Sequence, residues 1–153
     1  MFGVQWDLVL KHLSNKGVTD SLLKEDSSTW GNYRNQPFEI NRGKYSQASP
    51  WNTFIDYTTP TANNVTYENE VSTKLANQSI LLTTGASDTN SKYNIYDLAG
   101  NVWEWTLERT AVVSTPCADR GGHLYSAGSG ASSRGGNDPT SNSSGIGFRC
   151  SLY

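Results

Sequence analysis

The sequence predicts a loop-rich α+β domain in which one or two helices pack on short antiparallel strands. Three observations lead to this fold class. Apolar residues repeat at helical spacing near the start of the chain, over residues 4–16. Short apolar or alternating segments, typical of strands, lie in the second half. Only 35% of the residues are hydrophobic, but five Trp and eight Tyr can fill an aromatic core between many loops.

Length and composition limit the classes of protein to which the chain can belong. With 153 residues, we expect the range 1–153 to form one domain with a sizeable core. A net charge of −2 without a basic run argues against nucleic acid as a partner. No apolar run has the length of a membrane span, and the first residues lack the features of a signal peptide. We therefore expect no membrane insertion.

The first part of the chain predicts two helices. Helical spacing of apolar residues predicts a helix over 4–16 that packs on the core through Trp6, Val9, Leu10 and Leu13. Gly17 is placed to end this helix. Thr19 is a candidate cap for a second, short helix that ends before Ser27.

Residues 27–66 form a long irregular region, and long loops in compact domains are often functional. We expect five aromatic side chains to attach this region to the body of the domain: Trp30, Tyr33, Trp51, Phe54 and Tyr57. Stacking of these rings on a sugar is the alternative, although burial alone accounts for them. Residues 67–78 fit either a weak helix or a loop, and 80–84 predict a short buried strand.

The stretch 94–106 organises the rest of the chain. Trp103 and Trp105 flank Glu104 in an alternation that is typical of a strand. Because large aromatic side chains bury the most area, we expect a core strand here. The residues around Gly100 break the regular pattern and predict a structured turn before the strand.

Two more strands are expected after this stretch, over 119–125 and 146–152. Residues 107–118 form a connector to the first of them. Between the two strands lies a segment rich in Gly, Ser and Asn, residues 123–146. The prediction is therefore a small sheet with one long polar connection.

Several motifs resemble the formylglycine-generating enzyme (sulfatase-modifying factor) family. The segment Tyr96-Asp-Leu-Ala-Gly-Asn-Val-Trp-Glu-Trp105 is similar to the family signature, and Arg120-Gly-Gly122 and Gly147-Phe-Arg149 follow in the family's order. Trp6-Asp7 resembles the family's Trp-Glu helix. The resemblance spans nearly the whole chain and implies an irregular C-type-lectin-like fold. It also implies that 1–153 is the C-terminal portion of the domain, with the N-terminal part missing or reduced.

Two carboxylates flank the signature turn at a spacing suitable for calcium, which binds carboxylates and carbonyls together. The resemblance implies a structural calcium site with four ligand positions: the side chains of Asp97 and Glu104 and the carbonyls of Gly100 and Val102. The alternative is that both carboxylates accept backbone hydrogen bonds. Arg120 and Arg149 are expected to fork onto a carboxylate or onto carbonyls of a neighbouring loop, unless they are simply solvated.

The resembled oxidase binds copper through two cysteines downstream of its Arg-Gly-Gly. Soft sulfur ligands select Cu(I). The corresponding positions here are Ser126 and Ala131, neither of which can bind copper. We therefore expect no copper, no catalytic residues and no enzyme. The alternative is an enzyme of the sulfatase-activating type with altered or residual activity.

Other chemistry has little support. His12 and His123 cannot form a three-histidine metal site, and Ser126 near His123 lacks a nucleophile-elbow motif. Cys117 and Cys150 match no catalytic position. They can form a disulfide if strands 119–125 and 146–152 are neighbours, or they can remain free thiols, and the sequence does not decide between these.

The segment 123–146, which we call the variable-loop segment, is the candidate binding surface. Tyr, Ser, Gly and Asn are the residues that antibody paratopes use. The partner expected is a protein or glycan on a cell surface, and the location favoured is extracellular, on a cell surface or on a phage virion. The alternatives are an ordinary polar loop and a purely structural module. The candidate ligand-binding residues are His123, Tyr125, Ser126, Ser129, Asn137, Asp138 and Ser144.

Some proteins that resemble this family are targets of diversity-generating retroelements, which mutate adenines in AAY codons near the end of a gene. Such codons cannot become Lys, Glu, Gln, Met or Trp. None of these five residue types occurs over 109–153. This segment is therefore a candidate for diversification, although a Gly/Ser-rich loop excludes the same residues by itself.

Overall fold

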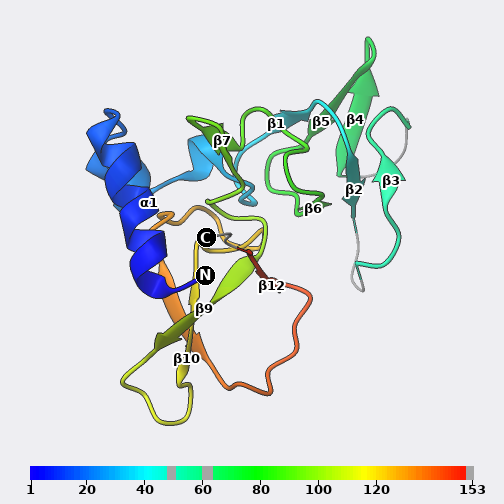
Figure 1. The fold of residues 1–153 in the computed structure, drawn as a ribbon. Helices are drawn as coiled ribbons and strands as arrows, with labels where there is room; N and C mark the ends of the chain where they lie inside the picture. Colours follow the sequence, from blue (N-terminus) through cyan, green and yellow to red (C-terminus); the bar gives the residue numbers. More distant parts are fainter. Residues whose placement is uncertain (48–50, 60–63, 151–153) are drawn as a thin grey trace.

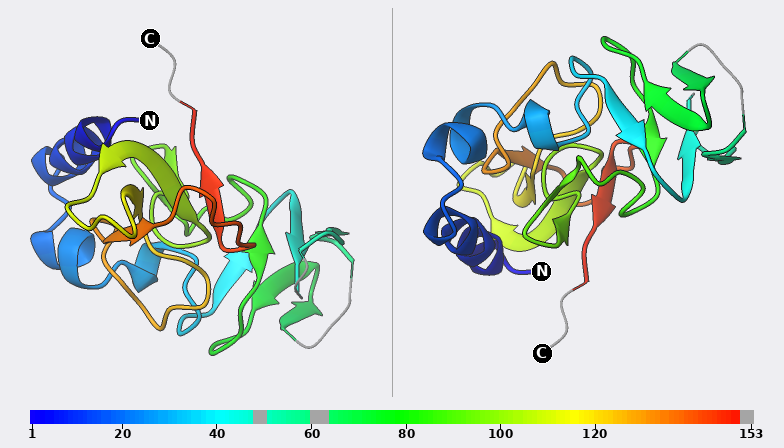
Figure 2. Two further views of the ribbon diagram at one scale, coloured as in Figure 1. Left: turned by 90° about the horizontal axis from the view of Figure 1, so that it is seen from below. Right: turned by 90° about the horizontal axis from the view of Figure 1, so that it is seen from above.

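The computed structural model describes residues 1–47, 51–59 and 64–150. Within these residues one α-helix, two short helical turns and many short strands are joined by loops, so the chain has the predicted loop-rich α+β fold (Figure 1). Helix α1 (Gly3–Asn15) lies at one end of the molecule and strands β3 (Ile55–Asp56) and β4 (Val65–Glu68) at the other, as both views of Figure 2 show. No helix in the described ranges is long and apolar enough to cross a membrane.

Helix α1 spans Gly3–Asn15, within one residue of the predicted range at each end, and buries Trp6 and Leu13. The chain leaves the helix through Gly17, whose φ of +94° belongs to the left-handed region that glycine tolerates. The second predicted helix is a single π-helical turn, Ser21–Glu25. Thr19 is not its cap, because Asp20 precedes the turn and no side chain caps it.

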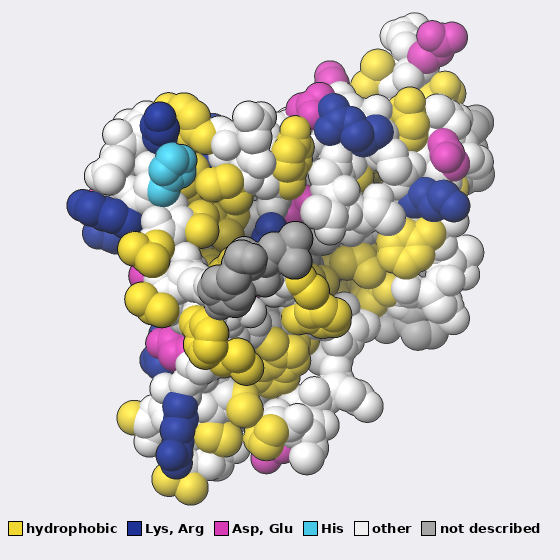
Figure 3. Space-filling model, in the orientation of Figure 1, with side chains coloured by type: hydrophobic (Ala, Val, Ile, Leu, Met, Phe, Trp, Pro, Cys, Tyr) yellow, Lys and Arg dark blue, Asp and Glu magenta, His cyan; other side chains and the backbone are white. Residues whose placement is uncertain are grey.

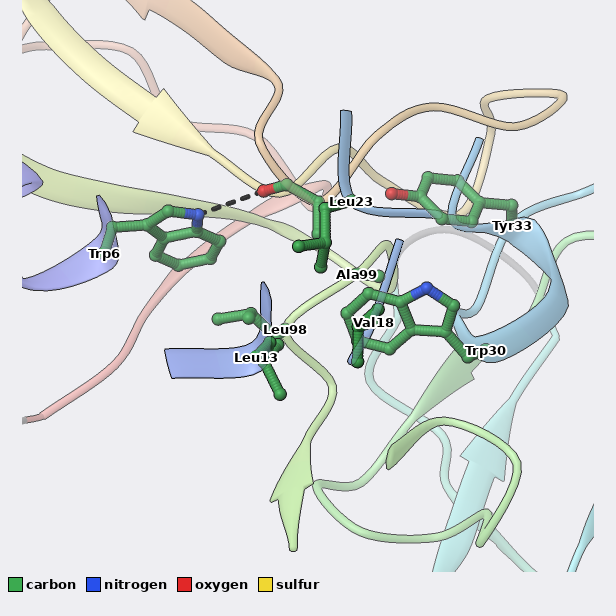
Figure 4. Packing of buried hydrophobic residues seen from close by; sticks show 9 residues of the cluster. Trp6, Leu13, Val18, Leu23, Trp30, Tyr33, Leu98 and Ala99 are labelled. Carbon is green, nitrogen blue, oxygen red and sulfur yellow. Dashed lines mark hydrogen bonds between the residues drawn. The ribbon is translucent and has the colours of Figure 1, made fainter. Parts of the chain in front are cut away.

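The main core lies between α1, the following turns and the signature turn (Figure 4). Its buried members are Trp6, Leu13, Val18, Leu23, Trp30, Tyr33, Leu98, Ala99 and Ala131. Both indole N–H groups are satisfied: Trp6 donates to the carbonyl of Ala131 at 3.0 Å, and Trp30 to that of Leu22 at 3.1 Å. The core therefore combines apolar burial with paired polar edges.

The region 27–66 contains more regular structure than the sequence predicted. It includes a 3₁₀ turn, Ser28–Trp30, and strands β1 (Phe38–Ile40), β2 (Lys44–Ser46), β3 (Ile55–Asp56) and the start of β4 (Val65–Glu68). Trp30 and Tyr33 are buried as expected, whereas Phe54 is 39% exposed. Strands of two to four residues are too short to show a period, which explains the error.

Residues 67–78, predicted as a weak helix or loop, contain the end of β4 and strand β5 (Val71–Lys74). These strands form a hairpin whose turn residues, Asn69 and Glu70, both have positive φ (50° and 66°). Such a turn matches the twist of a hairpin. Glu is an unusual residue in this turn, so the sequence lacks the Asn-Gly or Asp-Gly pair that would predict a hairpin. The sheet order is β1-β5-β4.

A second three-stranded sheet, β3-β2-β6, includes β6 (Leu81–Leu82), the strand predicted at 80–84. A second core packs beside these sheets, formed by Phe38, Ile40, Tyr45, Val65, Ile80, Leu82 and Ala86. A two-stranded ribbon of β7 (Ser91–Lys92) and β8 (Ile95–Tyr96) then leads into the signature turn.

The signature strand β9, Trp103–Arg109, lies inside a four-stranded sheet of order β11-β10-β9-β12. Its other strands are β10 (Cys117–Arg120), β11 (Arg134–Asn137) and β12 (Ile146–Phe148). The strand predicted over 119–125 ends at Arg120, because two glycines with positive φ follow. Strand β12 is parallel to β9, contrary to the antiparallel expectation, because the chain returns to β9 through a long connection.

The two cysteines are free thiols in this fold. The disulfide alternative required the strands of Cys117 and Cys150 to be neighbours. Strand β9 lies between β10 and β12, so this condition is not met. Cys117 is half-buried and Cys150 is exposed.

Candidate functional site

The alternation of β9 is real, but its buried face is the opposite of the predicted one. Glu104 and Thr106 are only 6% and 8% exposed, whereas Trp103 and Trp105 are half-buried. Hydrophobicity alone would place the two indole rings in the core. A buried carboxylate is tolerable only when a partner compensates its charge.

Arg149, after β12, is this partner. Its guanidinium binds both oxygens of the Glu104 carboxylate, with Nε–Oε2 at 2.8 Å and Nη2–Oε1 at 2.6 Å. The same group donates to the carbonyls of Tyr96 and Asp97 at 3.1 and 3.0 Å. The predicted structural role of Arg149, a fork onto a carboxylate and loop carbonyls, is therefore confirmed.

Asp97 lies in the signature turn with a φ of +52°. Its Oδ2 accepts the N–H of Gly85 at 2.6 Å, whereas Oδ1 is buried without a hydrogen-bond partner among the described residues. Desolvation by burial raises the pKa of the Asp97 carboxyl to about 6, even though the Gly85 bond and the charge of Arg149 favour the ionised form. The turn therefore holds one oxygen that still lacks a partner.

The geometry of the turn gives one observation in favour of the predicted calcium site and several against it. The unpaired Oδ1 of Asp97 suits a cation, but both oxygens of Glu104 are already bound by Arg149. Gly100 is buried against the backbone of Asn32, and the described residues hold no cluster of three His, Cys, Asp or Glu side chains. Of the two predicted carboxylate ligands, only Asp97 has an oxygen free, and calcium stays a prediction.

Asn101 joins three segments at the signature turn and was not predicted as a key residue. Its Oδ1 accepts the N–H of Leu82 at 3.0 Å and the amide of Asn32 at 2.9 Å, and its Nδ2 donates to the carbonyl of Leu82 at 3.1 Å. Its carbonyl accepts the N–H of Leu124 at 3.0 Å. Asn101 thus fixes the start of the variable-loop segment to β6 and to the loop at Asn32. An Asn beside the turn glycine was the only sequence signal.

Arg120 ties helix α1 to the sheet. Its side chain is 6% exposed, forms an ion pair with Asp7, donates to the carbonyl of Ser132 at 3.1 Å and lies 3.7 Å from Glu108. The prediction that Arg120 forks onto a carboxylate and a loop carbonyl is therefore confirmed, and the carboxylate is that of Asp7 in the Trp6-Asp7 motif.

The two positions that correspond to the family's cysteines have different environments. Ala131 is fully buried, and its backbone N–H donates to the hydroxyl of Ser27 at 2.7 Å. Ser126 is half-buried and its Oγ lies 2.9 Å from Nδ1 of His123. One position belongs to the core and the other is engaged with a neighbouring imidazole.

Four rings form a continuous row at the start of the variable-loop segment, which we call the aromatic row: Trp51, Tyr125, His123 and Trp103. The ring centroids of Trp51 and Tyr125 are 6.0 Å apart, those of Tyr125 and His123 5.5 Å, and those of His123 and Trp103 5.8 Å. Tyr125 is 43% exposed. The sequence did not place Trp51 or Trp103 here, because both contacts cross long distances in the chain.

The structure brings together only some of the predicted ligand-binding residues. His123, Tyr125 and Ser126 lie in or beside the aromatic row. Ser144 is exposed next to Gly145, and Gly145 packs on the rings of His123 and Tyr125. The others are engaged elsewhere. Ser129 contacts Ser133, Asn137 donates to Asp119, and the exposed Asp138 accepts from Thr140 at 2.8 Å.

Comparison with known proteins agrees with this architecture. The family model described as sulfatase-modifying factor enzyme 1-like domain matches residues 18–152. No curated protein and no solved structure gives a significant match. The matched range contains the signature turn, β9, the Arg-Gly-Gly and the Gly-Phe-Arg that forms the ion pair with Glu104. The chain therefore belongs to the sulfatase-modifying factor enzyme 1-like domain family.

Proposed function

We propose that this domain is a non-catalytic binding module that presents the variable-loop segment to a ligand or receptor. The observation that carries the proposal is the aromatic row, in which two rings of this segment meet two rings from distant parts of the chain. Partly exposed aromatic side chains that are already fixed lose little conformational entropy on binding. A row of such rings is therefore a suitable anchor for a ligand.

The scaffold beneath the row supports this role. Asn101 holds the backbone at Leu124, between the two rings of the segment. A Cβ at Gly145 would lie 3.4 Å from the ring of His123, so the returning chain packs closely on the row. Binding loops gain precision when a rigid body positions them.

The proposed absence of catalysis rests on the family's two cysteine positions. Ser126 and Ala131 offer no soft ligand for copper, and Ala131 is buried in the main core. The hydrogen bond between Ser126 and His123 involves Nδ1, and Asp119, the acid whose charge acts on His123, accepts a hydrogen bond from Asn137. A residual oxidase activity is the competing proposal.

We further propose a location on a phage or bacterial surface, with diversification of the segment as the source of specificity. The absence of five residue types over 109–153 supports this. Calcium is proposed only as a structural ion at Asp97, where one carboxylate oxygen is unpaired.

The test is binding of the fluorescently labelled domain to a panel of bacterial cells. Tyr125→Ala should weaken binding about tenfold to any cell that the native domain labels, the effect of losing one ring contact. Tyr93→Ala is the matched control, because Tyr93 is another exposed tyrosine (54%) outside the segment. Labelling that survives Tyr125→Ala and His123→Ala together would contradict the proposal. Copper-dependent turnover of a cysteine-containing sulfatase peptide would contradict the non-catalytic part.

A further inference from the structure

We propose that the aromatic row is a stacking platform for the apolar face of a neutral sugar ring, so that the ligand of this domain is a neutral glycan. The inference rests on the proposed binding function and names its ligand class. It follows from three properties of the row: its shape, its polar surroundings and its charge.

The shape of the row suits a ring-sized ligand. Neighbouring rings are tilted by 48°, 78° and 39°, so their planes change direction along the row and do not form one flat stack. Tyr125 is the most exposed ring, and Trp51, His123 and Trp103 are half-buried beside it. A protein partner needs a surface of about 800 Å² on each side. The row offers a compact apolar patch with steps of 5.5–6.0 Å, on which one sugar ring can lie.

Hydroxyl groups border the row. Ser126 Oγ lies 2.9 Å from the imidazole of His123, and Ser143 Oγ accepts the N–H of Gly145 at 3.2 Å. A Cβ at Gly145 would lie 3.4 Å from the ring of His123, 3.7 Å from Ser143 Oγ and 4.0 Å from the ring of Tyr125, so Ser143 and both rings meet around this residue. A serine hydroxyl can both donate and accept, and so can the hydroxyls of a sugar. A pyranose has an apolar ring face and hydroxyl groups around its edge, so aromatic rings beside serine hydroxyls can contact both.

The segment itself offers little positive charge that could bind an anionic sugar. Residues 123–146 contain one basic residue, Arg134, whose Nε is paired with Glu108 at 2.7 Å. Burial lowers the pKa of His123, so the imidazole is neutral at pH 7. The exposed Asp138 adds a negative charge near the segment's end. On the face shown in Figure 3, which includes helix α1, dark blue and magenta side chains are dispersed, without a large patch of one sign. Sialylated, sulfated and uronic glycans would find no free cation in the described part of the segment.

The experiment is a titration of the native domain with soluble hexaoses of glucose, mannose, galactose and N-acetylglucosamine. Intrinsic tryptophan fluorescence reports on the row through Trp51 and Trp103, and ligand-observed NMR reports on the sugar. At least one neutral hexaose should bind saturably. Tyr125→Ala and Trp51→Ala should each weaken binding about tenfold, the effect of losing one ring contact. Tyr93→Ala should leave the affinity within about twofold of the native value, and thermal melting of each variant controls for folding.

The outcomes separate this inference from the proposed function. If no neutral hexaose binds, or only sulfated or sialylated glycans bind, the neutral-sugar inference is wrong. Capture of a cell-surface protein that depends on Tyr125 would also overturn it, while the proposed binding function would stand. If a hexaose binds equally well to the folded native domain and to folded Tyr125→Ala and Trp51→Ala variants, the row is not the site and both proposals fail.

Discussion

The ion pair between Glu104 and Arg149 should dominate the stability of the signature turn. In the substitution Arg149→Gln, the carboxylate of Glu104 stays 6% exposed but loses its counter-charge. The carbonyls of Tyr96 and Asp97 lose their donors at the same time. Breaking one partner of a buried pair costs about 3–5 kcal/mol. Because the Arg149 side chain is 24% exposed, we expect the lower end, about 3 kcal/mol of unfolding free energy.

A double-mutant cycle separates the pair from its surroundings. Glu104→Gln removes the buried charge, so Arg149→Gln should be less harmful in that background, with a coupling of about 2 kcal/mol. Arg149→Lys keeps the charge but cannot bind both oxygens, and should lie between the native protein and Arg149→Gln. The assay is urea unfolding at pH 7, followed by tryptophan fluorescence and far-UV circular dichroism. Additive free energies, or a loss below about 0.5 kcal/mol for Arg149→Gln, would refute the reasoning.

Three further predictions concern the same turn. Asn101→Ala should lower the unfolding free energy by about 3 kcal/mol. Asn101→Gly should cost about 1 kcal/mol less than Asn101→Ala, because glycine tolerates the φ of +63° at this position. Equal losses for the two variants in urea unfolding would contradict this. The folded-state pKa of Asp97, about 6, is raised, so the folded protein binds the extra proton and stability falls as pH rises from about 4 to 6. Asp97→Asn should remove this slope, and an unchanged slope would exclude Asp97 as its source. Calcium should raise the Tm of Arg149→Gln more than that of the native domain, because Glu104 is then free to bind the ion. The measurement is thermal melting of both proteins with calcium and with chelator. An unchanged Tm in both proteins would rule out the calcium site.

The sequence by itself determined the features that depend on neighbouring residues. The helical spacing around Trp6, the turn glycine at 100 and the alternation of β9 are local patterns, and each appears in the structure. The order of the signature, Arg-Gly-Gly and Gly-Phe-Arg motifs indicated the family, which the match over residues 18–152 confirms. Short strands such as β2 and β3 were not predicted, because two or three residues are too few to show an alternation of apolar and polar side chains.

Only the tertiary structure decided which face of β9 is buried. Hydrophobicity favoured Trp103 and Trp105, but the carboxylate between them is buried because a guanidinium 45 residues later reaches it. The same holds for the candidate site. Trp51 and Tyr125 are far apart in the chain, and Asn101 fixes the backbone beside one of them. A period along a sequence reports the local fold of the backbone, whereas pairing of charges and rings across long separations depends on how the strands are ordered, which no local pattern contains.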